Sequence, residues 1–150
     1  TMGSMTFKQY DYVRVDSNGK LRPIHIEHGK NVIQRHRRSK WVEEHLVPTP
    51  RQVDEGDGWK EFIVGEYETI FFSLRRLDFE RECCQDTQGE FHVLTLVDGE
   101  HVLVQSLDDP KYCFEQRFLE IVVVPANVGR YVIKNLGSEP IRMHKVKLKD

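Results

Sequence analysis

The chain has 150 residues, of which 39% are hydrophobic and 31% are charged, a composition typical of one globular domain with an appended segment. Its 22 lysine and arginine residues against 24 aspartate and glutamate residues give a net charge of −2, which excludes a general attraction to nucleic acid or to a membrane surface. No run of residues approaches the roughly 18 apolar residues that span a bilayer.

The first part of the chain, residues 5–60, is predicted to be an irregular and partly helical linker. Residues 1–4 are interpreted as an expression scar and are left out of the fold prediction. Helical spacing of apolar residues predicts a helix within His25–Arg38 and a further helical turn at Trp41–Leu46. Pro48 and Pro50 then favour an extended connection.

The second part, residues 61–150, is predicted to be mainly β. Short runs rich in β-branched and aromatic residues are separated by glycine, proline and aspartate, at the spacing typical of a sandwich or barrel. These runs lie at 61–64, 70–77, 91–97, 101–105, 120–124 and 129–133.

Two features of this β region predict how its strands are connected. Asp98–Gly99 is the strongest turn signal in the sequence, because a tight hairpin needs residues that tolerate positive φ. The alternation in Met143–Leu148 predicts a last strand, which we expect to pair with the first and protect a sheet edge.

Three cysteines do not form a disulfide framework, and the adjacent Cys83 and Cys84 are poorly placed to bridge each other. All three are therefore predicted to be reduced, and the protein to be cytoplasmic.

Two stretches of the β region resemble the strand motifs of a cupin barrel, Glu90–Glu100 and Val122–Arg130. The resemblance predicts a single jelly-roll β-barrel of the cupin type over residues 61–150. Metal-binding cupins carry a His-x-His pair, a glutamate and a later histidine in these motifs. The matching positions here are Asp86, Gln88, His92 and Arg130, so no metal site is expected in this chain.

The linker makes the resemblance more specific. Tyr10–Arg14 followed by Asn18–Glu27 is similar to the segment that joins the two halves of short bacterial class I mannose-6-phosphate isomerases. Together with the barrel motifs, the resemblance covers nearly the whole chain from Thr6 and implies the C-terminal cupin domain of that family.

The family resemblance also implies what this chain lacks. The zinc ligands of the family lie in its N-terminal cupin half, to which nothing here corresponds, so the chain is expected to have no catalytic residues, no cofactor and no isomerase activity of its own. Lys8 stands where the family has an arginine thought to face the active site. The lysine keeps the positive charge but lacks the planar guanidinium that can donate two parallel hydrogen bonds. Arg14 matches the second arginine of the motif. It either contacts a ligand or is a structural residue that fixes the linker to the barrel.

Inside the predicted barrel, Gln88, His92 and Arg130 are the candidate binding residues, with Asp86 beside them. Arg130 would hold a carboxylate or phosphate. His92 is either a hydrogen-bonded core histidine or a ligand contact in the barrel mouth.

These observations leave three functions open. The first is the non-catalytic C-terminal part of a mannose-6-phosphate isomerase-like protein, and the second is a stand-alone, metal-free cupin that binds a sugar, sugar phosphate or small anion as a sensor or regulatory module. The third is a structural domain that docks on a separate catalytic chain. The expected partners are a sugar phosphate and a catalytic cupin half or separate chain, without nucleic acid or membrane, and homodimerisation is left open.

Overall fold

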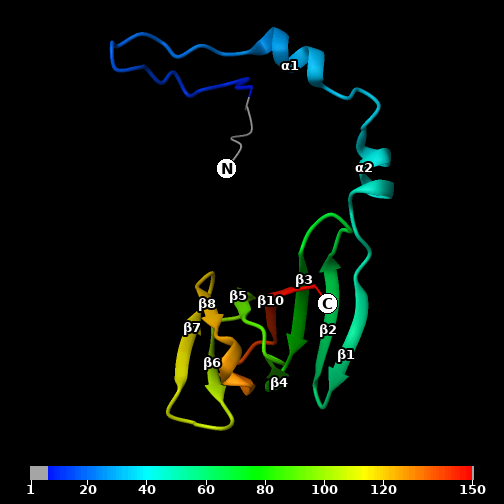
Figure 1. Cartoon of the computed structure of the whole chain (residues 1–150), viewed down its shortest axis with the longest axis vertical. Helices are drawn as coiled ribbons and strands as arrows, with labels where there is room; N and C mark the ends of the chain where they lie inside the picture. The colour runs from blue at the N-terminus through cyan, green and yellow to red at the C-terminus, as the bar shows by residue number, and fades with distance from the viewer. Residues whose placement is uncertain (1–6, 150) are drawn as a thin grey trace. The chain divides into compact units, whose positions relative to one another are not determined.

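The computed structural model describes residues 7–149, and the chain divides into two compact units between Val47 and Pro48 (Figure 1). The strand region begins earlier than the sequence indicated, at Arg51 rather than Glu61. Half of the residues in Arg51–Gly56 are charged, and the segment lacks the apolar alternation that marks a strand in sequence.

The described residues of the first unit, 7–47, contain two short helices, α1 (Ile26–Val32) and α2 (Ser39–His45). Helix α1 ends at Val32, well before Arg38, because Ile33 already has an extended backbone. Gly29, which weakens a helix in isolation, leaves room here for the amide end of the Gln9 side chain, which occupies the space that a β-carbon would take. No helix in residues 7–149 is both long and apolar enough to cross a membrane.

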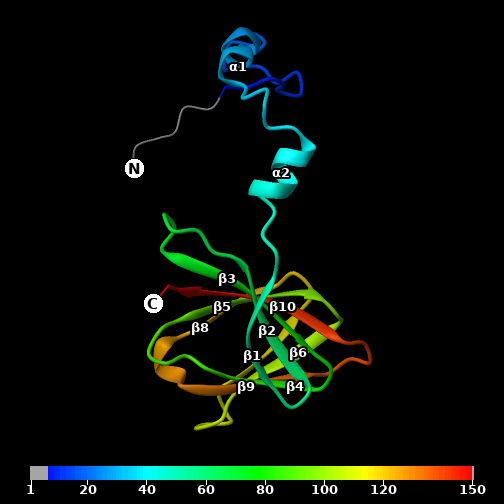
Figure 2. The same cartoon turned by 90° about the vertical axis from the view of Figure 1, so that its right-hand side faces the viewer.

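In its described part, residues 48–149, the second unit contains ten strands in two antiparallel sheets and a short 3-10 helix, Ala126–Val128 (Figure 2). The six-stranded sheet has the order β1-β2-β3-β10-β5-β8, and the four-stranded sheet has the order β4-β9-β6-β7. The strands are β1 (Arg51–Gly56), β2 (Trp59–Gly65), β3 (Phe72–Phe79), β4 (Glu82–Asp86), β5 (His92–Asp98), β6 (His101–Ser106), β7 (Cys113–Arg117), β8 (Ile121–Val124), β9 (Arg130–Asn135) and β10 (Ile141–Leu148).

The predicted mainly β class is confirmed, whereas a closed barrel is not found: within residues 7–149 no strand of one sheet pairs with a strand of the other. The core lies between the sheets. It is formed by inward-facing side chains of both, among them Leu77, Leu94, Leu96, Ile133 and Met143.

Two predictions about strand connections were wrong. Strand β10 does not pair with the first strand, because it lies inside the six-stranded sheet between β3 and β5. The turn at Asp98–Gly99 does not close a hairpin, because β5 and β6 belong to different sheets. Gly99 has the expected positive φ of 110°, which here turns the chain from one sheet to the other.

Candidate functional site

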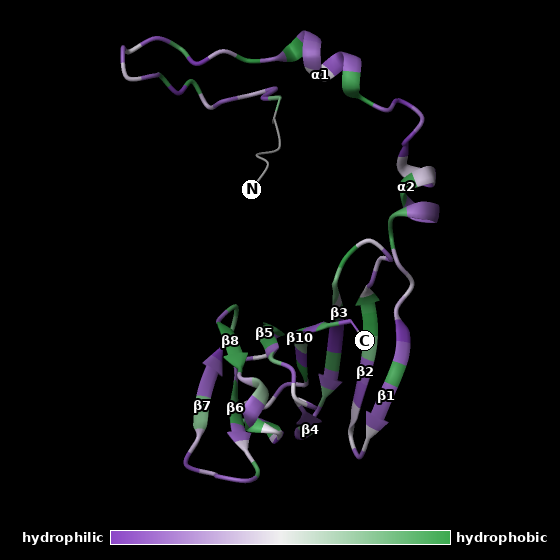
Figure 3. Ribbon diagram, in the orientation of Figure 1, coloured by the Kyte–Doolittle hydropathy of each residue, from purple (hydrophilic) through white to green (hydrophobic). Residues whose placement is uncertain are grey.

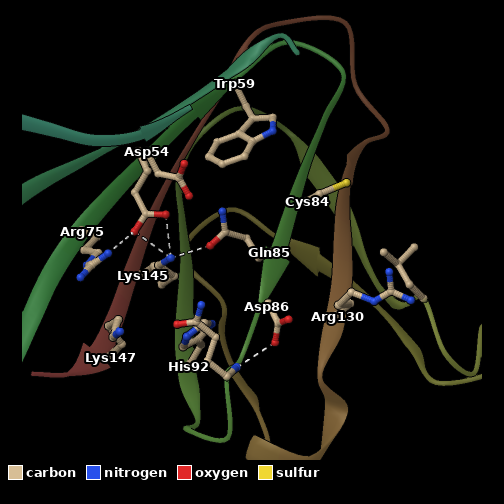
Figure 4. Close-up of a pocket in the computed structure, with 13 residues that line it drawn as sticks. Asp54, Trp59, Arg75, Cys84, Gln85, Asp86, His92, Arg130, Lys145 and Lys147 are labelled. Carbon is tan, nitrogen blue, oxygen red and sulfur yellow. Dashed lines mark hydrogen bonds and ion pairs between the residues drawn. The ribbon is translucent and has the colours of Figure 1, made fainter. Parts of the chain in front are cut away.

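A cavity of about 470 Å³ opens in the second unit and takes its lining from both sheets (Figure 4). Its walls are mostly polar or charged, which is unusual for the interior of a sandwich. The lining residues are Asp54, Trp59, Glu61, Arg75, Cys84, Gln85, Asp86, Gln88, His92, Leu107, Arg130, Lys145 and Lys147.

The floor of the cavity is a buried ion cluster centred on Glu61. Both carboxylate oxygens of Glu61 lie 2.8 Å from the Lys145 ammonium, and the Arg75 guanidinium donates to Oε1 at 2.9 Å. Glu61 and Lys145 are only 2% and 3% exposed. The Lys145 ammonium also donates to the side-chain oxygen of Gln85, so three protein oxygens surround it.

The electrostatics of this cluster favour an ionised Glu61. Burial acts to raise the pKa of Glu61, but the charge of Lys145 and the hydrogen bonds from Lys145 and Arg75 outweigh burial and lower it. Burial lowers the pKa of Lys145, and the neighbouring Glu61 carboxylate opposes that change. Removing Glu61 would leave the buried Lys145 ammonium without a carboxylate partner, whereas removing Lys145 would leave Glu61 paired with Arg75 alone.

Positive charge slightly exceeds negative charge in the lining of the cavity. Lys147 follows Lys145 on the inward-facing side of β10 and is 9% exposed. The cations of the lining are Arg75, Arg130, Lys145 and Lys147, and its carboxylates are Asp54, Glu61 and Asp86, which leaves an excess of one positive charge. A cavity with a net positive lining attracts an anion.

His92 lies in the wall as a neutral, hydrogen-bonded side chain. It is 2% exposed, and its Nδ1 is 2.8 Å from the Tyr131 hydroxyl. Burial lowers the pKa of His92 to about 4, and the charges of Lys145 and Lys147 act in the same direction. The side chain fits the interpretation as a core histidine with a satisfied partner, and it also borders the cavity.

Gln88 and Arg130 border the same cavity at its exposed rim. Gln88 follows Asp86, whose carboxylate accepts from the Gln88 backbone N–H at 2.8 Å. The Arg130 guanidinium is 67% exposed and 3.4 Å from Asp108. Figure 4 shows Arg130 apart from the Lys145 cluster, so it is a rim cation rather than part of the floor.

Trp59 and Asp54 form the wall on the β1–β2 side (Figure 4). The indole lies over Gly56, where a β-carbon would be 2.3 Å from the Trp59 Nε1. Gly56 therefore leaves room for the ring, which lines the cavity. An aromatic face beside polar groups is suited to packing against the apolar face of a sugar ring.

The other two predicted site residues, Lys8 and Arg14, lie in the first unit and share a different partner. The Lys8 ammonium is 3.9 Å and the Arg14 guanidinium 3.4 Å from the buried Asp11 carboxylate, and Arg22 approaches Asp11 to 2.7 Å. Both residues are thus engaged within their own unit. Whether either contacts a ligand stays a prediction.

The described residues 7–149 assemble no group of three or more histidine, cysteine, aspartate and glutamate side chains suited to a metal. All three cysteines are free, as predicted, and Cys84 lines the cavity.

The sequence prediction missed the charged floor, although β10 carries a signal for it. Ile141 and Met143 are buried on one face of β10, and Lys145 and Lys147 continue that face at the same two-residue period. Lysines in register with core residues indicate a polar cavity next to the core.

Comparison with solved structures establishes a cupin fold for the second unit. Similar structures include a cupin domain of Cnp3 from Schizosaccharomyces pombe (16% identity, 67% of this chain and 69% of that chain, TM-score 0.51). A cupin-2 domain from Rhodospirillum rubrum is also similar (7% identity, 68% and 70% covered, TM-score 0.53). No family model matches the sequence, and no curated protein is significantly similar to it.

The mannose 6-phosphate isomerase from Bacillus subtilis is similar over a longer part of the chain. It has 20% identity and a TM-score of 0.58, and the match covers 93% of this chain but only 39% of the isomerase. The second unit, residues 48–150, makes up 103 of the 150 residues, so the match extends into the first unit. At this identity the likeness concerns the fold alone.

Proposed function

We propose that this chain is a non-catalytic cupin module that binds a small anionic ligand in the cavity of its second unit, with a sugar phosphate as the class that fits. The observation that carries the proposal is the charged lining of the cavity, in which four cations face three carboxylates. A phosphate group carries about −1.5 to −2 charges at neutral pH and is attracted by this excess of positive charge.

The rest of the cavity suits the other end of such a ligand. The Trp59 ring offers an apolar face, and Gln88 and Asp86 offer polar groups for hydroxyls. A volume of about 470 Å³ lies within the roughly 300–1,000 Å³ of small-molecule sites. In this arrangement the phosphate lies toward Lys147 and Arg75, and the sugar ring lies toward Trp59.

The proposal is tested by thermal unfolding with mannose 6-phosphate, fructose 6-phosphate, mannose and inorganic phosphate. We expect the sugar phosphates to stabilise the protein by about 2.7 kcal/mol at 100 times Kd, phosphate to stabilise it less, and mannose not to stabilise it.

A variant of the site gives a second test. Lys147→Met keeps a side chain of similar length and removes its charge, and it is expected to weaken sugar-phosphate binding at least tenfold. The matched control is Lys60→Met on the same sheet at an exposed position. Absence of stabilisation by every anion would contradict the proposal.

A second candidate is the role implied by the resemblance, a C-terminal part of a mannose-6-phosphate isomerase-like protein. The observation that favours it is the match to the isomerase over 93% of this chain. In that role the cavity would serve as a site separate from the zinc centre of the family. The chain by itself is then expected not to convert mannose 6-phosphate to fructose 6-phosphate, with or without added zinc, and zinc-dependent turnover would contradict this role.

A further inference from the structure

The two units of the chain carry opposite net charges, which the charge of the whole chain conceals. Residues 1–47 hold nine lysine and arginine residues against five aspartate and glutamate residues, whereas residues 48–150 hold 13 against 19. The first unit therefore has a net charge of +4 and the second a net charge of −6. The expectation of no nucleic-acid partner rests on the whole-chain value, so it does not apply to the first unit by itself.

The positive charge of the first unit is concentrated around the connection between α1 and α2. Residues 28–42 contain five cations and no carboxylate, and four of the cations lie within residues 35–40, which we call the basic run. All residues of the basic run are exposed, and in Figure 3 the connection is hydrophilic. Within residues 7–149, none of Arg35, Arg37 and Arg38 forms an ion pair, and Lys40 lies 3.8 Å from Glu44.

Planar side chains lie directly beside the basic run. The Arg37 guanidinium lies over the Trp41 ring at 4.8 Å, and the His45 imidazole stacks on the same indole, with ring centroids 4.6 Å apart and 6° between the ring planes. His36 packs perpendicular to the indole at 5.7 Å. The His45 Nδ1 lies 2.9 Å from the Trp41 carbonyl oxygen, which orients the imidazole. Because His36 and His45 are exposed, this stack offers planar groups to solvent.

We propose that the basic run and the stack beside it bind a single-stranded nucleic acid. Proteins that bind single strands combine cations for the phosphates with planar side chains on which the bases stack. Both sets of groups are present here within residues 35–45. The carboxylates of this segment do not oppose the contact: Glu44 approaches Lys40, and Glu43 lies two positions from both Trp41 and His45, on the opposite side of α2.

Other anionic partners account for fewer of these observations. A membrane surface is bound by cations together with apolar side chains that enter the lipid, but residues 34–40 contain no apolar side chain. An acidic protein would pair with the cations and leave the planar groups without a role. A nucleic-acid duplex would also leave them unused, because its bases already stack on one another. The observations therefore favour unpaired bases and the phosphates that link them.

The first experiment measures binding of the full chain to a short fluorescein-labelled oligouridylate by fluorescence anisotropy over a salt series. Four phosphate contacts predict a slope of log affinity against log salt of about −2.8, which weakens binding about 50-fold between roughly 50 and 200 mM salt. Arg35→Gln/Arg38→Gln removes two of the contacts and is expected to halve the slope. Lys20→Gln/Lys30→Gln makes the same change in net charge at exposed positions outside the basic run, and it should leave binding unchanged.

A second variant tests the planar groups separately from the charges. His45→Ala removes an exposed ring from the stack, and it is expected to weaken binding about 5- to 150-fold, the range that base stacking on an aromatic side chain covers. The salt slope should stay the same, because no phosphate contact is removed. A loss of structure in the first unit would disturb the cations as well, so a decrease in the slope would overturn the assignment of the stack to the bases.

Three results would overturn the proposal as a whole. Neither the oligouridylate nor an oligodeoxythymidylate of the same length binds at about 50 mM salt, where phosphate contacts are strong. A duplex of that length binds more tightly than either single strand. Lys20→Gln/Lys30→Gln weakens binding as much as Arg35→Gln/Arg38→Gln does. Binding of phosphatidylserine vesicles without binding of either oligonucleotide would assign the basic run to a membrane surface instead.

Discussion

His92 shows how one residue at the cavity makes stability depend on pH. Its pKa is lowered from 6.5 to about 4 in the folded protein, mainly by burial and then by Lys145 and Lys147. The folded state therefore resists protonation of His92, while the unfolded state accepts a proton near pH 6.5. The contribution of this neutral histidine is fully present above pH 6.5 and is lost as the pH falls toward 4, to a total of about 3 kcal/mol.

We therefore expect His92→Gln, which retains a hydrogen-bonding group for Tyr131, to flatten the loss of stability between pH 6.5 and 4. The free energy of unfolding in urea at several pH values in this window measures the effect. His144→Gln is the control, because burial, Arg76 and Arg142 also lower the pKa of His144, but its side chain is less buried. An equal slope in the wild type and His92→Gln would show that another group titrates in this window.

At the same scale, the sequence was informative about some site residues and silent about others. The cupin motif positions led to Gln88, His92 and Arg130, and all three border one cavity. Glu61 and Arg75 were not identified, because each looks like an ordinary polar residue in a strand, and they meet only when β2 and β3 pair. The placement of Lys8 and Arg14 around Asp11 was equally hidden, since ion pairs depend on the folded backbone.

At the scale of elements, the sequence predicted strands where apolar residues dominate. Strands β5 and β6 alternate regularly between buried and partly exposed residues. Their predicted ranges, 91–97 and 101–105, differ from the observed ranges by at most one residue at each end. Strands β4 and β7 were missed because they are short and carry polar residues such as Glu82, Gln85 and Gln116. Their strand conformation is stabilised by pairing with β9 and β6, which is information that the local sequence does not contain.

The turn between β5 and β6 provides a test at this scale. Gly99 has φ of 110°, and an added β-carbon would lie 2.3 Å from Cδ1 of Ile141. We expect Gly99→Ala to destabilise the protein by about 1–3 kcal/mol through backbone strain, with a further cost from the displaced Ile141 side chain. Gly89→Ala is the matched control, because Gly89 has φ of 84° but no atom within 4 Å of the added carbon. Equal losses of unfolding free energy in urea would show that Ile141 moves aside freely.

For the molecule as a whole, composition and strand spacing predicted the β class, but the order of the strands was beyond local reasoning. Strand β10 at the end of the chain inserts between β3 and β5, so its neighbours are fixed by contacts across many residues. This insertion also creates the cavity floor, because it carries Lys145 to Glu61. The site and the strand order therefore could only be recognised together.

The division of the chain into two units gives a prediction for the whole molecule. The core side chains lie within Leu77–Met143, and in residues 7–47 only Asp11 and Gly29 are buried. We therefore expect the fragment 48–150 to unfold cooperatively with a Tm within about 4 °C of the full chain, a difference below roughly 1 kcal/mol.

The fragment 61–150 is the informative comparison, because it begins at the boundary that the sequence suggested. It lacks β1, whose residues from Arg51 to Gly56 pair with β2, and it lacks Trp59, which packs against the core and forms a wall of the cavity. Loss of the partly buried Trp59 ring removes packing against the core, and β2 would become an unprotected edge. We expect this fragment to melt well below the fragment 48–150 and to lose ligand stabilisation, as followed by circular dichroism. Equal melting of the two fragments would mean that β1 contributes nothing to the folded unit, and the boundary at residue 61 would then be the correct one.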